Sequence, residues 1–435
     1  MEQLILKPVR HVEGEIKLPG SKSLSNRLLL ISALAHGTTE VHNLLDSDDT
    51  RHMVAALRTL GVSLDLSPDR TSCLIEGLDG PFAPQETSLF LGNAGTAIRP
   101  LFAALCLGRG VYTLTGEPRM LERPIADLAD SLRQMGADIE FLGEEGYPPL
   151  RIRAEGLTGG SVSVRGDVSS QYLTALLLAS PLTQREMVIE VEGELVSKPY
   201  IDMTMDVMAR FGVQVENQDH RVFRVPAGEG YQSPGRALVE GDASSATYFL
   251  SAAAIRGGTV RVNGVGADSV QGDVEHSGIL EEMGATVRRG PDWIEVTGGE
   301  LHGVDVDLNH MPDAAMTIAT TALFAQGTTV IRNIYNWRVK ETDRIAAIAT
   351  ELAKIGCRVD TQADELTVTP PDGGVDCSPG CEPVTFDTYD DHRMAMSLAL
   401  VGLRRPNVFI NDPGCVNKTY AGFWADLASI CEAAR

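Results

Sequence analysis

Positively charged side chains gather at a few Gly-, Ser- and Pro-rich junctions that open apolar segments of the sequence. Lys22 and Arg27 lie in one of them, Leu18-Pro-Gly-Ser-Lys-Ser-Leu-Ser-Asn-Arg27. A helix start offers free backbone N–H groups and the positive end of the helix dipole, so cations and hydroxyls there favour an anion site. The junction is not a P-loop, because the second glycine and its spacer are missing. A Ser-capped helix with solvated Lys22 and Arg27 is an equal alternative on this motif alone.

Further junctions in the first half carry the same residue types. In Leu91-Gly-Asn-Ala-Gly-Thr-Ala-Ile-Arg-Pro100, Gly95 would let a ligand approach the backbone closely. Arg123 precedes a proline-opened helix, and arginine is the natural bidentate partner of carboxylate and phosphate. Neutral hydrogen-bonding groups precede two more helices: Ser169, Ser170, Gln171 and Ser197. Ordinary helix capping is the alternative for each of these junctions.

The second half mixes acids with the cations. Asp313 precedes an apolar helix, expected over 314–325, and a capping aspartate is its alternative reading. The segment Asn336-Trp-Arg-Val-Lys-Glu-Thr-Asp-Arg344 packs five charges between a strand and a helix, and Lys340 and Arg344 would share a helix face if it is helical. Asp390-Asp-His-Arg393 opens another apolar helix, and Lys418 lies in a later junction.

The paired acids Asp48-Asp49 and Asp390-Asp391 raise the question of a magnesium ion. An octahedral site takes one or two carboxylates and substrate phosphate. Here arginine and histidine are interleaved with the acids and can neutralise them instead. Cys377 and Cys381 lack two further well-spaced metal ligands. We therefore expect no metal.

An internal repeat organises the elements that must position these residues. A helix, a glycine and an alternating strand recur in five copies, with the glycines 75, 76, 72 and 72 residues apart: Gly61, Gly136, Gly212, Gly284 and Gly356. Each glycine suits the left-handed position that closes a helix. A second helix–strand junction keeps the same spacing, as at Gly258-Thr-Val-Arg-Val-Asn-Gly264. The length then predicts about six α/β units of about 73 residues each.

The two ends of the sequence do not fit this repeat. The opening segment 4–18 has strands without a preceding helix, and the last helix, expected over 423–432, has no strand after it. We expect the N-terminal strands to complete the last unit. The chain would then form two domains, residues 1–20 with 241–435 and residues 21–240, and cross between them near Gly20 and Gly241.

Composition excludes several classes of partner. The net charge is −22, with 37 Lys and Arg against 59 Asp and Glu and no basic tail, so nucleic acid and anionic membranes would be repelled. No apolar run is long enough for a membrane span, and we find no secretory signal. Seven scattered cysteines are typical of reduced thiols. We expect a cytoplasmic protein that is a monomer.

The motifs together closely resemble those of the EPSP synthase family of enolpyruvyl transferases. The resemblance runs through the motifs at Leu18–Arg27, Leu91–Pro100, Gly116–Ile125, Lys340–Arg344, Asp390–Arg393 and Lys418. It implies an α/β (α+β) fold of two domains, an inside-out α/β barrel with three βαβαββ-type units in each, and an active site in the cleft between them. It also implies transfer of the enolpyruvyl group of phosphoenolpyruvate to the 5-hydroxyl of 3-phosphoshikimate in aromatic amino-acid synthesis, with release of phosphate and no organic cofactor.

The resemblance assigns roles to individual residues. It implies a phosphoenolpyruvate site of Lys22, Gly95, Arg123, Gln171, Arg344, Arg393 and Lys418. It implies a 3-phosphoshikimate site of Lys22, Ser23, Arg27, Ser169, Ser170, Gln171, Ser197, Asp313, Asn336 and Lys340. Glu341 is the implied proton donor to the methylene carbon and Asp313 the implied base for the hydroxyl, with Lys340 assisting. The division of acid and base roles among these three and Lys22 stays open.

Two other readings of the same motifs differ in testable ways. The transferases that act on UDP-N-acetylglucosamine carry a cysteine in the segment matching Gly116–Pro124, and this sequence has none there. A non-catalytic anion-binding homologue would keep the cations but could lose Asp313 or Glu341, and both are present. Gly95 would leave room for the herbicide glyphosate, so inhibition that competes with phosphoenolpyruvate is a hypothesis.

Overall fold

The chain divides into two compact units, and each crossing between them falls beside a glycine. In this computed structural model, which describes residues 2–83, 85–228 and 230–433, unit 1 holds the residues up to Pro19 and from Gly241 onward, and unit 2 holds Gly20–Glu240. A Cβ on Gly20 would lie 1.9 Å from the carbonyl oxygen of Asn43, and one on Gly241 would lie 2.9 Å from that of Gly264. The backbone passes too close to its neighbours at both crossings for any larger residue.

Unit 2 is built from three sheets with one shared strand order, β15–β4–β6–β5, β7–β8–β10–β9 and β11–β12–β14–β13. In each sheet the first two strands are parallel and the other two pair antiparallel. The strands are β4 (Thr38–His42), β5 (Ser63–Leu66), β6 (Ser72–Glu76), β7 (Gln85–Phe90), β8 (Arg109–Thr115), β9 (Asp138–Phe141), β10 (Leu150–Glu155), β11 (Gly160–Arg165), β12 (Met187–Glu192), β13 (Glu216–Gln218), β14 (Val222–Val225) and β15 (Arg236–Leu238).

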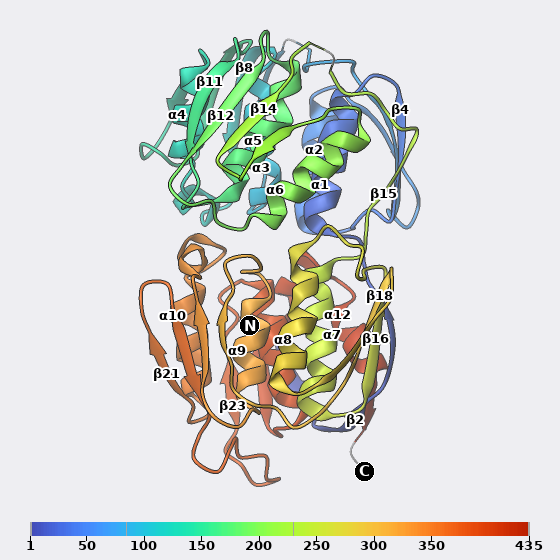
Figure 1. Ribbon diagram of the computed structural model, residues 1–435, viewed down its shortest axis with the longest axis vertical. Helices are drawn as coiled ribbons and strands as arrows, with labels where there is room; N and C mark the ends of the chain where they lie inside the picture. The colour runs from blue at the N-terminus through green and yellow to red at the C-terminus, as the bar shows by residue number, and fades with distance from the viewer. Residues whose placement is uncertain (1, 84, 229, 434–435) are drawn as a thin grey trace. The chain divides into compact units, whose positions relative to one another are not determined.

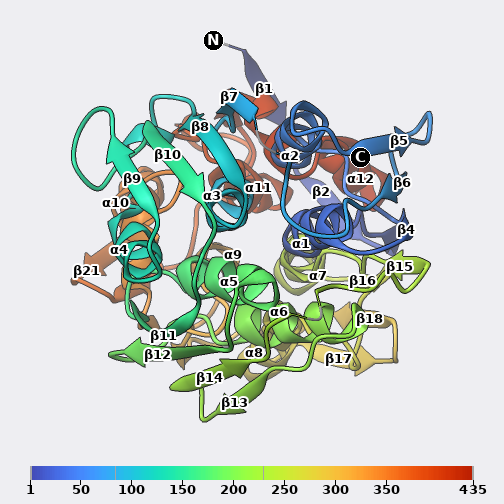
Figure 2. The same ribbon diagram turned by 90° about the horizontal axis from the view of Figure 1, so that it is seen from above.

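Three buried helices fill the interior of unit 2, and three amphipathic ones complete it. The buried helices are α1 (Lys22–Leu34), α3 (Gly95–Cys106) and α5 (Ser170–Ala179), and all of α1 is buried. The amphipathic ones are α2 (Asp48–Thr59), α4 (Ala126–Gln134) and α6 (Pro199–Arg210). Their apolar stripes pack on the core, and charged residues such as Arg58, Asp130 and Arg210 lie on their exposed sides. Figure 2 looks down on α1, α3 and α5, with the strands of unit 2 around them.

Unit 1 repeats this architecture. Its sheets are β17–β18–β16–β3, β19–β20–β22–β21 and the three-stranded β1–β24–β23, with a separate pair, β2–β25. The strands are β1 (Gln3–Leu6), β2 (Val9–Val12), β3 (Gly14–Lys17), β16 (Thr259–Asn263), β17 (Thr286–Arg289), β18 (Trp293–Thr297), β19 (Asp305–Asp307), β20 (Thr329–Arg332), β21 (Arg358–Thr361), β22 (Leu366–Thr369), β23 (Val384–Phe386), β24 (Val408–Asn411) and β25 (Cys431–Ala433). The buried helices are α7 (Ala243–Arg256), α9 (Ala315–Ala322) and α11 (His392–Ala399), and the outer ones are α8 (His276–Met283), α10 (Arg344–Ala353) and α12 (Phe423–Ser429) (Figure 1).

The order of elements along the chain explains the matching sheets. Strand, buried helix, strand, outer helix and two antiparallel strands follow one another from β7 to β10, from β11 to β14 and from β19 to β22. The first strand is parallel to the second because a helix carries the chain back between them. In two copies the chain crosses between the first strand and the first helix: β3 leads into α1, and β15 leads into α7.

The predicted helix-closing glycines are confirmed. Gly61, Gly136, Gly212, Gly284 and Gly356 all have left-handed backbone, with φ between 80° and 117°. Each follows an outer helix and precedes a short strand. The regular spacing therefore marks the same structural position in five of the six copies.

The expectation for the C-terminus is wrong. The last helix, α12, ends at Ser429, and Cys431–Ala433 forms β25 instead of continuing the helix to 432. β25 pairs antiparallel with β2, whose backbone would otherwise form an open edge. The N-terminal strands also do not all join the last copy: β1 pairs with β24 as expected, but β3 pairs with β16.

Among the described residues, no helix combines the length and the apolar character needed to cross a membrane.

Candidate active site

In unit 2 the first turns of the three buried helices meet. Asn26 donates to Thr96 at 2.8 Å, which joins α1 to α3, and Arg99 donates to Gln171 at 2.8 Å, which joins α3 to α5. Arg27 on α1 also reaches Thr174 on α5, at 3.2 Å. Three helix N-termini therefore converge on one region, where their dipoles add positive potential to that of the cations.

Arg27 is a buried cation with neutral partners. Its guanidinium donates to the hydroxyls of Thr204 and Thr174 and to the carbonyl oxygens of Ser23 and Tyr200, at 2.9 to 3.2 Å. The side chain is 5 % exposed, and burial lowers the pKa of Arg27 to about 10. A buried charge held only by neutral groups costs free energy, and a bound anion would offset that cost.

Gly95 lies against two arginines at the start of α3. A Cβ there would be 2.6 Å from Nη1 of Arg99 and 2.8 Å from Nη2 of Arg123. Arg123 is 3 % exposed and donates to the carbonyl oxygen and to Oδ1 of Asn93, at 3.0 and 2.8 Å. Any side chain here would therefore displace the guanidinium ends of both arginines.

The acid pair Asp48-Asp49 lies near two cations, Lys22 and Arg51. The Lys22 ammonium lies 3.7 Å from Oδ2 of buried Asp49, while Asp48 lies 3.7 Å from Arg51. Each of these two acids therefore lies near a cation. Within the part of the chain that the structure describes, no group of three His, Cys, Asp or Glu side chains is placed to hold a metal ion.

The serines of unit 2 lie at helix starts, as the sequence predicted. Ser23 and Ser170 belong to the first turns of α1 and α5, and Ser169 caps α5 by accepting a hydrogen bond from the Gln171 N–H at 3.2 Å. The capping role is thus real for Ser169. Ser197 precedes α6 and has left-handed backbone, with φ of 56°.

In unit 1 Arg344 is the centre of a network of carboxylates. It is 1 % exposed and donates to both oxygens of Asp391 at 2.8 and 3.2 Å, to Glu341 at 2.9 Å and to Asp313 at 3.1 Å. Burial opposes the charge of Arg344, but Asp391, Glu341 and Asp313 outweigh it and raise the pKa of the guanidinium. Asp391 therefore neutralises an arginine, as its interleaving with cations indicated.

Asp313 is held by three cations and does not cap α9. Its oxygens accept from Arg344 at 3.1 Å and Arg393 at 3.0 Å, and the Lys340 ammonium lies 3.6 Å away. α9 begins at Ala315, without a side-chain cap. Lys340 and Arg344 do not share a helix face, because α10 starts only at Arg344. Both nevertheless reach the same carboxylate.

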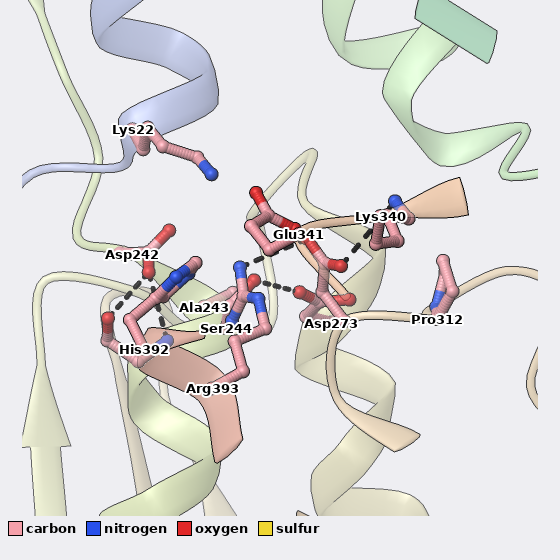
Figure 3. A network of polar contacts seen from close by, with 12 residues as sticks. Lys22, Asp242, Ala243, Ser244, Asp273, Pro312, Lys340, Glu341, His392 and Arg393 are labelled. Atoms are coloured by element: carbon pink, nitrogen blue, oxygen red, sulfur yellow. Dashed lines mark hydrogen bonds and ion pairs between the residues drawn. The ribbon is translucent and has the colours of Figure 1, made fainter. Parts of the chain in front are cut away.

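Glu341 completes the group in unit 1. It is 8 % exposed and lies 3.8 Å from the ammonium of Lys418. Asn336 is also buried, and its neighbour Trp337 donates to the carbonyl oxygen of Pro312 at 2.7 Å, which ties this segment to the residue before Asp313. Figure 3 shows Lys340, Glu341 and Arg393 pointing toward one region, from the loop before α10 and the start of α11.

The expected site residues thus fall into two groups, one in each unit. The unit 2 group is Lys22, Ser23, Arg27, Gly95, Arg123, Ser169, Ser170, Gln171 and Ser197. The unit 1 group is Asp313, Asn336, Lys340, Glu341, Arg344, Arg393 and Lys418.

Sequence reasoning missed three contributors. Arg99 holds Gln171, and Tyr248 accepts a hydrogen bond from Arg393 at 3.2 Å. Asp273 is buried in the 3-10 turn Gly272–Glu275 before α8, and it accepts a hydrogen bond from Ser244 at the start of α7 (Figure 3). Arg99 was visible in its motif. Nothing local marks Tyr248 or Asp273, because their partners lie far away in the sequence.

Comparison with solved structures gives the class of protein. An enolpyruvyl transferase from Streptomyces tendae, NikO, shares the fold, with a TM-score of 0.76 at 18 % identity over 99 % of this chain and 97 % of that one. An EPSP synthase from Acinetobacter baumannii has a TM-score of 0.81 at 27 % identity over 99 % of this chain and 98 % of that one. The fold is that of the enolpyruvyl transferases.

Sequence comparison defines the class further. The family model of EPSP synthase (3-phosphoshikimate 1-carboxyvinyltransferase) matches residues 6–427. A 3-phosphoshikimate 1-carboxyvinyltransferase from Vibrio vulnificus (strain YJ016) is 57 % identical over 435 residues, which is 100 % of both chains. The chain belongs to the EPSP synthase family, and it is a transferase.

Proposed function

We propose that this chain transfers the enolpyruvyl group of phosphoenolpyruvate to the 5-hydroxyl of 3-phosphoshikimate and releases phosphate. The observation that carries the proposal is the contrast within the site: Arg27 is a buried cation with neutral partners, whereas Arg344 is a buried cation among three acids. The first arrangement suits an anionic group of a substrate. The second supplies the acids and bases that proton transfer requires.

The charges of the substrates account for the number of cations. Two phosphates and two carboxylates carry roughly −5 to −6 together. We assign phosphoenolpyruvate to Lys22, the Gly95 backbone, Arg123, Gln171, Arg344, Arg393 and Lys418. We assign 3-phosphoshikimate to Lys22, Ser23, Arg27, Ser169, Ser170, Gln171, Ser197, Asp313, Asn336 and Lys340. Each of the two sets contains residues of both units.

The reaction is an addition followed by an elimination. A proton adds to the methylene carbon of phosphoenolpyruvate, and the 5-hydroxyl oxygen attacks the neighbouring carbon as it loses its own proton. The tetrahedral intermediate then loses phosphate by cleavage of its C–O bond, and the new methyl group returns a proton. We assign Glu341 as the donor to the methylene carbon and Asp313, assisted by Lys340, as the base for the hydroxyl, with Lys22 as a further candidate.

The ion pairs of Asp313 support its role as the base. Two guanidinium groups fix both of its oxygens and so orient the carboxylate. The same cations weaken it as a base while no substrate is bound. Substrate phosphate and carboxylate groups would draw on Arg344 and Arg393, which would strengthen Asp313 as a base once the substrates are bound. The arginines would also stabilise the negative charge of the departing phosphate.

We propose that the protein is a monomeric enzyme of the cytoplasm. The free thiols of Cys73, Cys106, Cys357, Cys381 and Cys415 support a reducing compartment.

A phosphate-release assay with purified protein tests the proposal. Phosphate should appear only when both phosphoenolpyruvate and 3-phosphoshikimate are present, in a one-to-one ratio with the enolpyruvyl product. Omission of either substrate is the control, and UDP-N-acetylglucosamine in place of 3-phosphoshikimate should give no product. Release with UDP-N-acetylglucosamine would establish the other transferase activity, and binding without turnover would establish a non-catalytic homologue.

A further inference from the structure

The segment between β23 and α11 contains an unfavourable backbone turn directly before the site. Tyr389 and Asp390 are consecutive residues with left-handed backbone, with φ of 56° and 54°. This conformation is uncommon for residues other than glycine; an aspartate adopts it more readily than a tyrosine, for which it costs free energy. The next residues are Asp391 and, at the start of α11, His392 and Arg393.

One end of this segment is fixed by the site itself. Asp391 is fully buried, binds Arg344 through both oxygens, and accepts from the backbone N–H of Arg393 at 2.9 Å. Its position therefore sets the position of two cations at once. Arg344 is the first residue of α10, and Arg393 lies in the first turn of α11.

The other end of the segment is fixed by Glu351. Glu351 is fully buried on α10, seven residues after Arg344, which places both side chains on one face of the helix two turns apart. Its Oε1 accepts from the Tyr389 hydroxyl at 2.7 Å, and its Oε2 accepts from the backbone N–H of Asp387 at 3.0 Å. The segment from Asp387 to Asp391 is thus tied to α10 at two points on either side of the left-handed turn.

Lys354 supports the charge of Glu351. Its ammonium lies 2.7 Å from Oε2 of Glu351 and donates to Asp387 and to the carbonyl oxygen of Thr385, each at 3.0 Å. A buried carboxylate is tolerated only with such partners. Burial and the bond to Glu351 raise the pKa of Tyr389, which keeps its hydroxyl proton on the oxygen as a donor.

We propose that Glu351 and Tyr389 are positioning residues: together they hold the left-handed turn that delivers Asp391 to Arg344 and sets Arg393 at the start of α11. This inference rests on the proposed function, in which both arginines bind phosphoenolpyruvate. Without the tie at Glu351 the turn relaxes toward ordinary backbone angles, and Asp391 withdraws from Arg344.

Tyr389→Phe is a clean test, because the ring of Tyr389 is 41 % exposed and its loss of one hydroxyl leaves no core cavity. We expect the KM for phosphoenolpyruvate to rise by about three- to tenfold, as for loss of one hydrogen bond to a charged acceptor, while the KM for 3-phosphoshikimate changes by less than about twofold. Glu351→Gln keeps the shape of the side chain and should give a similar split. Glu351→Ala should give a larger one.

The matched control is Tyr231→Phe. It removes a hydroxyl that donates to the carbonyl oxygen of Leu178 at 2.9 Å, near the end of α5 away from its first turn. It should leave both KM values unchanged. Equal rises in both KM values, or none, in Tyr389→Phe would overturn the inference. Failure of the wild-type protein to release phosphate would instead reject the proposed function, so the two failures are distinguishable.

Discussion

The two groups of site residues are built at equivalent places but on opposite electrostatic plans. In both units an arginine joins two buried helices: Arg27 joins α1 to α5 in unit 2, and Arg393 joins α11 to α7 in unit 1. Arg27 has only hydroxyl and carbonyl partners among the described residues. Arg344 is paired with three carboxylates. The same repeat therefore holds a buried cation among neutral partners in one unit and a buried cation among carboxylates in the other, and we propose that the first binds anions and the second transfers protons.

The largest expected effect concerns the acids of unit 1. Asp313→Asn keeps the size of the side chain but removes the proposed base, so kcat should fall by about 1,000-fold, within the range of general base catalysis. The Kd for 3-phosphoshikimate, measured by titration calorimetry, should change by less than about tenfold. A kcat within tenfold of wild type would show that Asp313 is not the base and that unit 1, like unit 2, only binds substrate.

Replacing each of the two buried arginines by methionine should change the stability of the substrate-free protein by different amounts. Arg344→Met leaves Asp391, Glu341 and Asp313 without their shared partner and should lower the free energy of unfolding by about 3–5 kcal/mol. Arg27→Met removes an uncompensated buried charge and should change the free energy of unfolding by about 1 kcal/mol or less. Urea unfolding measures both.

The Arg27→Met protein should nevertheless have a KM for 3-phosphoshikimate about 100-fold above that of the wild type, since a charged hydrogen bond to the substrate is lost. Equal destabilisation by the two arginine substitutions would contradict the comparison between the units.

A pH series should reveal the crowding of acids in unit 1. Burial, with the nearby charge of Asp313 as the second cause, raises the pKa of Asp273 to about 7 from its ordinary 3.8. The folded state therefore keeps a proton that the unfolded state has lost between pH 4 and pH 7. Over that window this carboxyl progressively destabilises the wild type, and above pH 7 the penalty is constant.

Asp273→Asn cannot ionise and should match the wild type near pH 4. It should exceed the wild type in unfolding free energy by on the order of 4 kcal/mol at pH 8. A difference that does not grow with pH would mean that Asp273 ionises normally in the fold.

The smallest effect belongs to the receptor in unit 2. Gly95→Ala forces the ends of Arg99 and Arg123 to move, because its Cβ would lie 2.6 and 2.8 Å from them. We expect the KM for phosphoenolpyruvate to rise by about tenfold, with little change for 3-phosphoshikimate. Gly380→Ala is the control, since a Cβ there meets nothing within 4 Å. An unchanged KM for phosphoenolpyruvate would remove Gly95 from the receptor.

Local chemistry made much of the fold predictable. The glycines that close the outer helices require a left-handed residue, so their spacing exposed the repeat without any tertiary information. The C-terminal strand was not predictable, because Cys431–Ala433 has no strand signal of its own and becomes β25 only through pairing with β2.

The site shows the same division. Clusters such as Lys340–Arg344 can be recognised from their composition. The partners in each ion pair cannot be, since Arg344 and Asp391 are 47 residues apart in the sequence and Arg393 and Asp313 are 80 apart. For the same reason, only the folded structure shows that Asp313 binds arginines instead of capping α9.

The two crossings at Gly20 and Gly241 have a consequence for the gene. Unit 2 is one continuous insertion whose ends meet, because the N–H of Ser21 donates to the carbonyl oxygen of Glu240 at 2.8 Å. The flanking ends of unit 1 also meet, since the N–H of Asp242 donates to the carbonyl oxygen of Pro19 at 2.9 Å. Excision of residues 20–240 and direct ligation of Pro19 to Gly241 would connect β3 to α7 and restore an uninterrupted β–α–β run. The two ends of each unit are thus already hydrogen-bonded to each other, so a direct link across either pair of ends would need little change of backbone path.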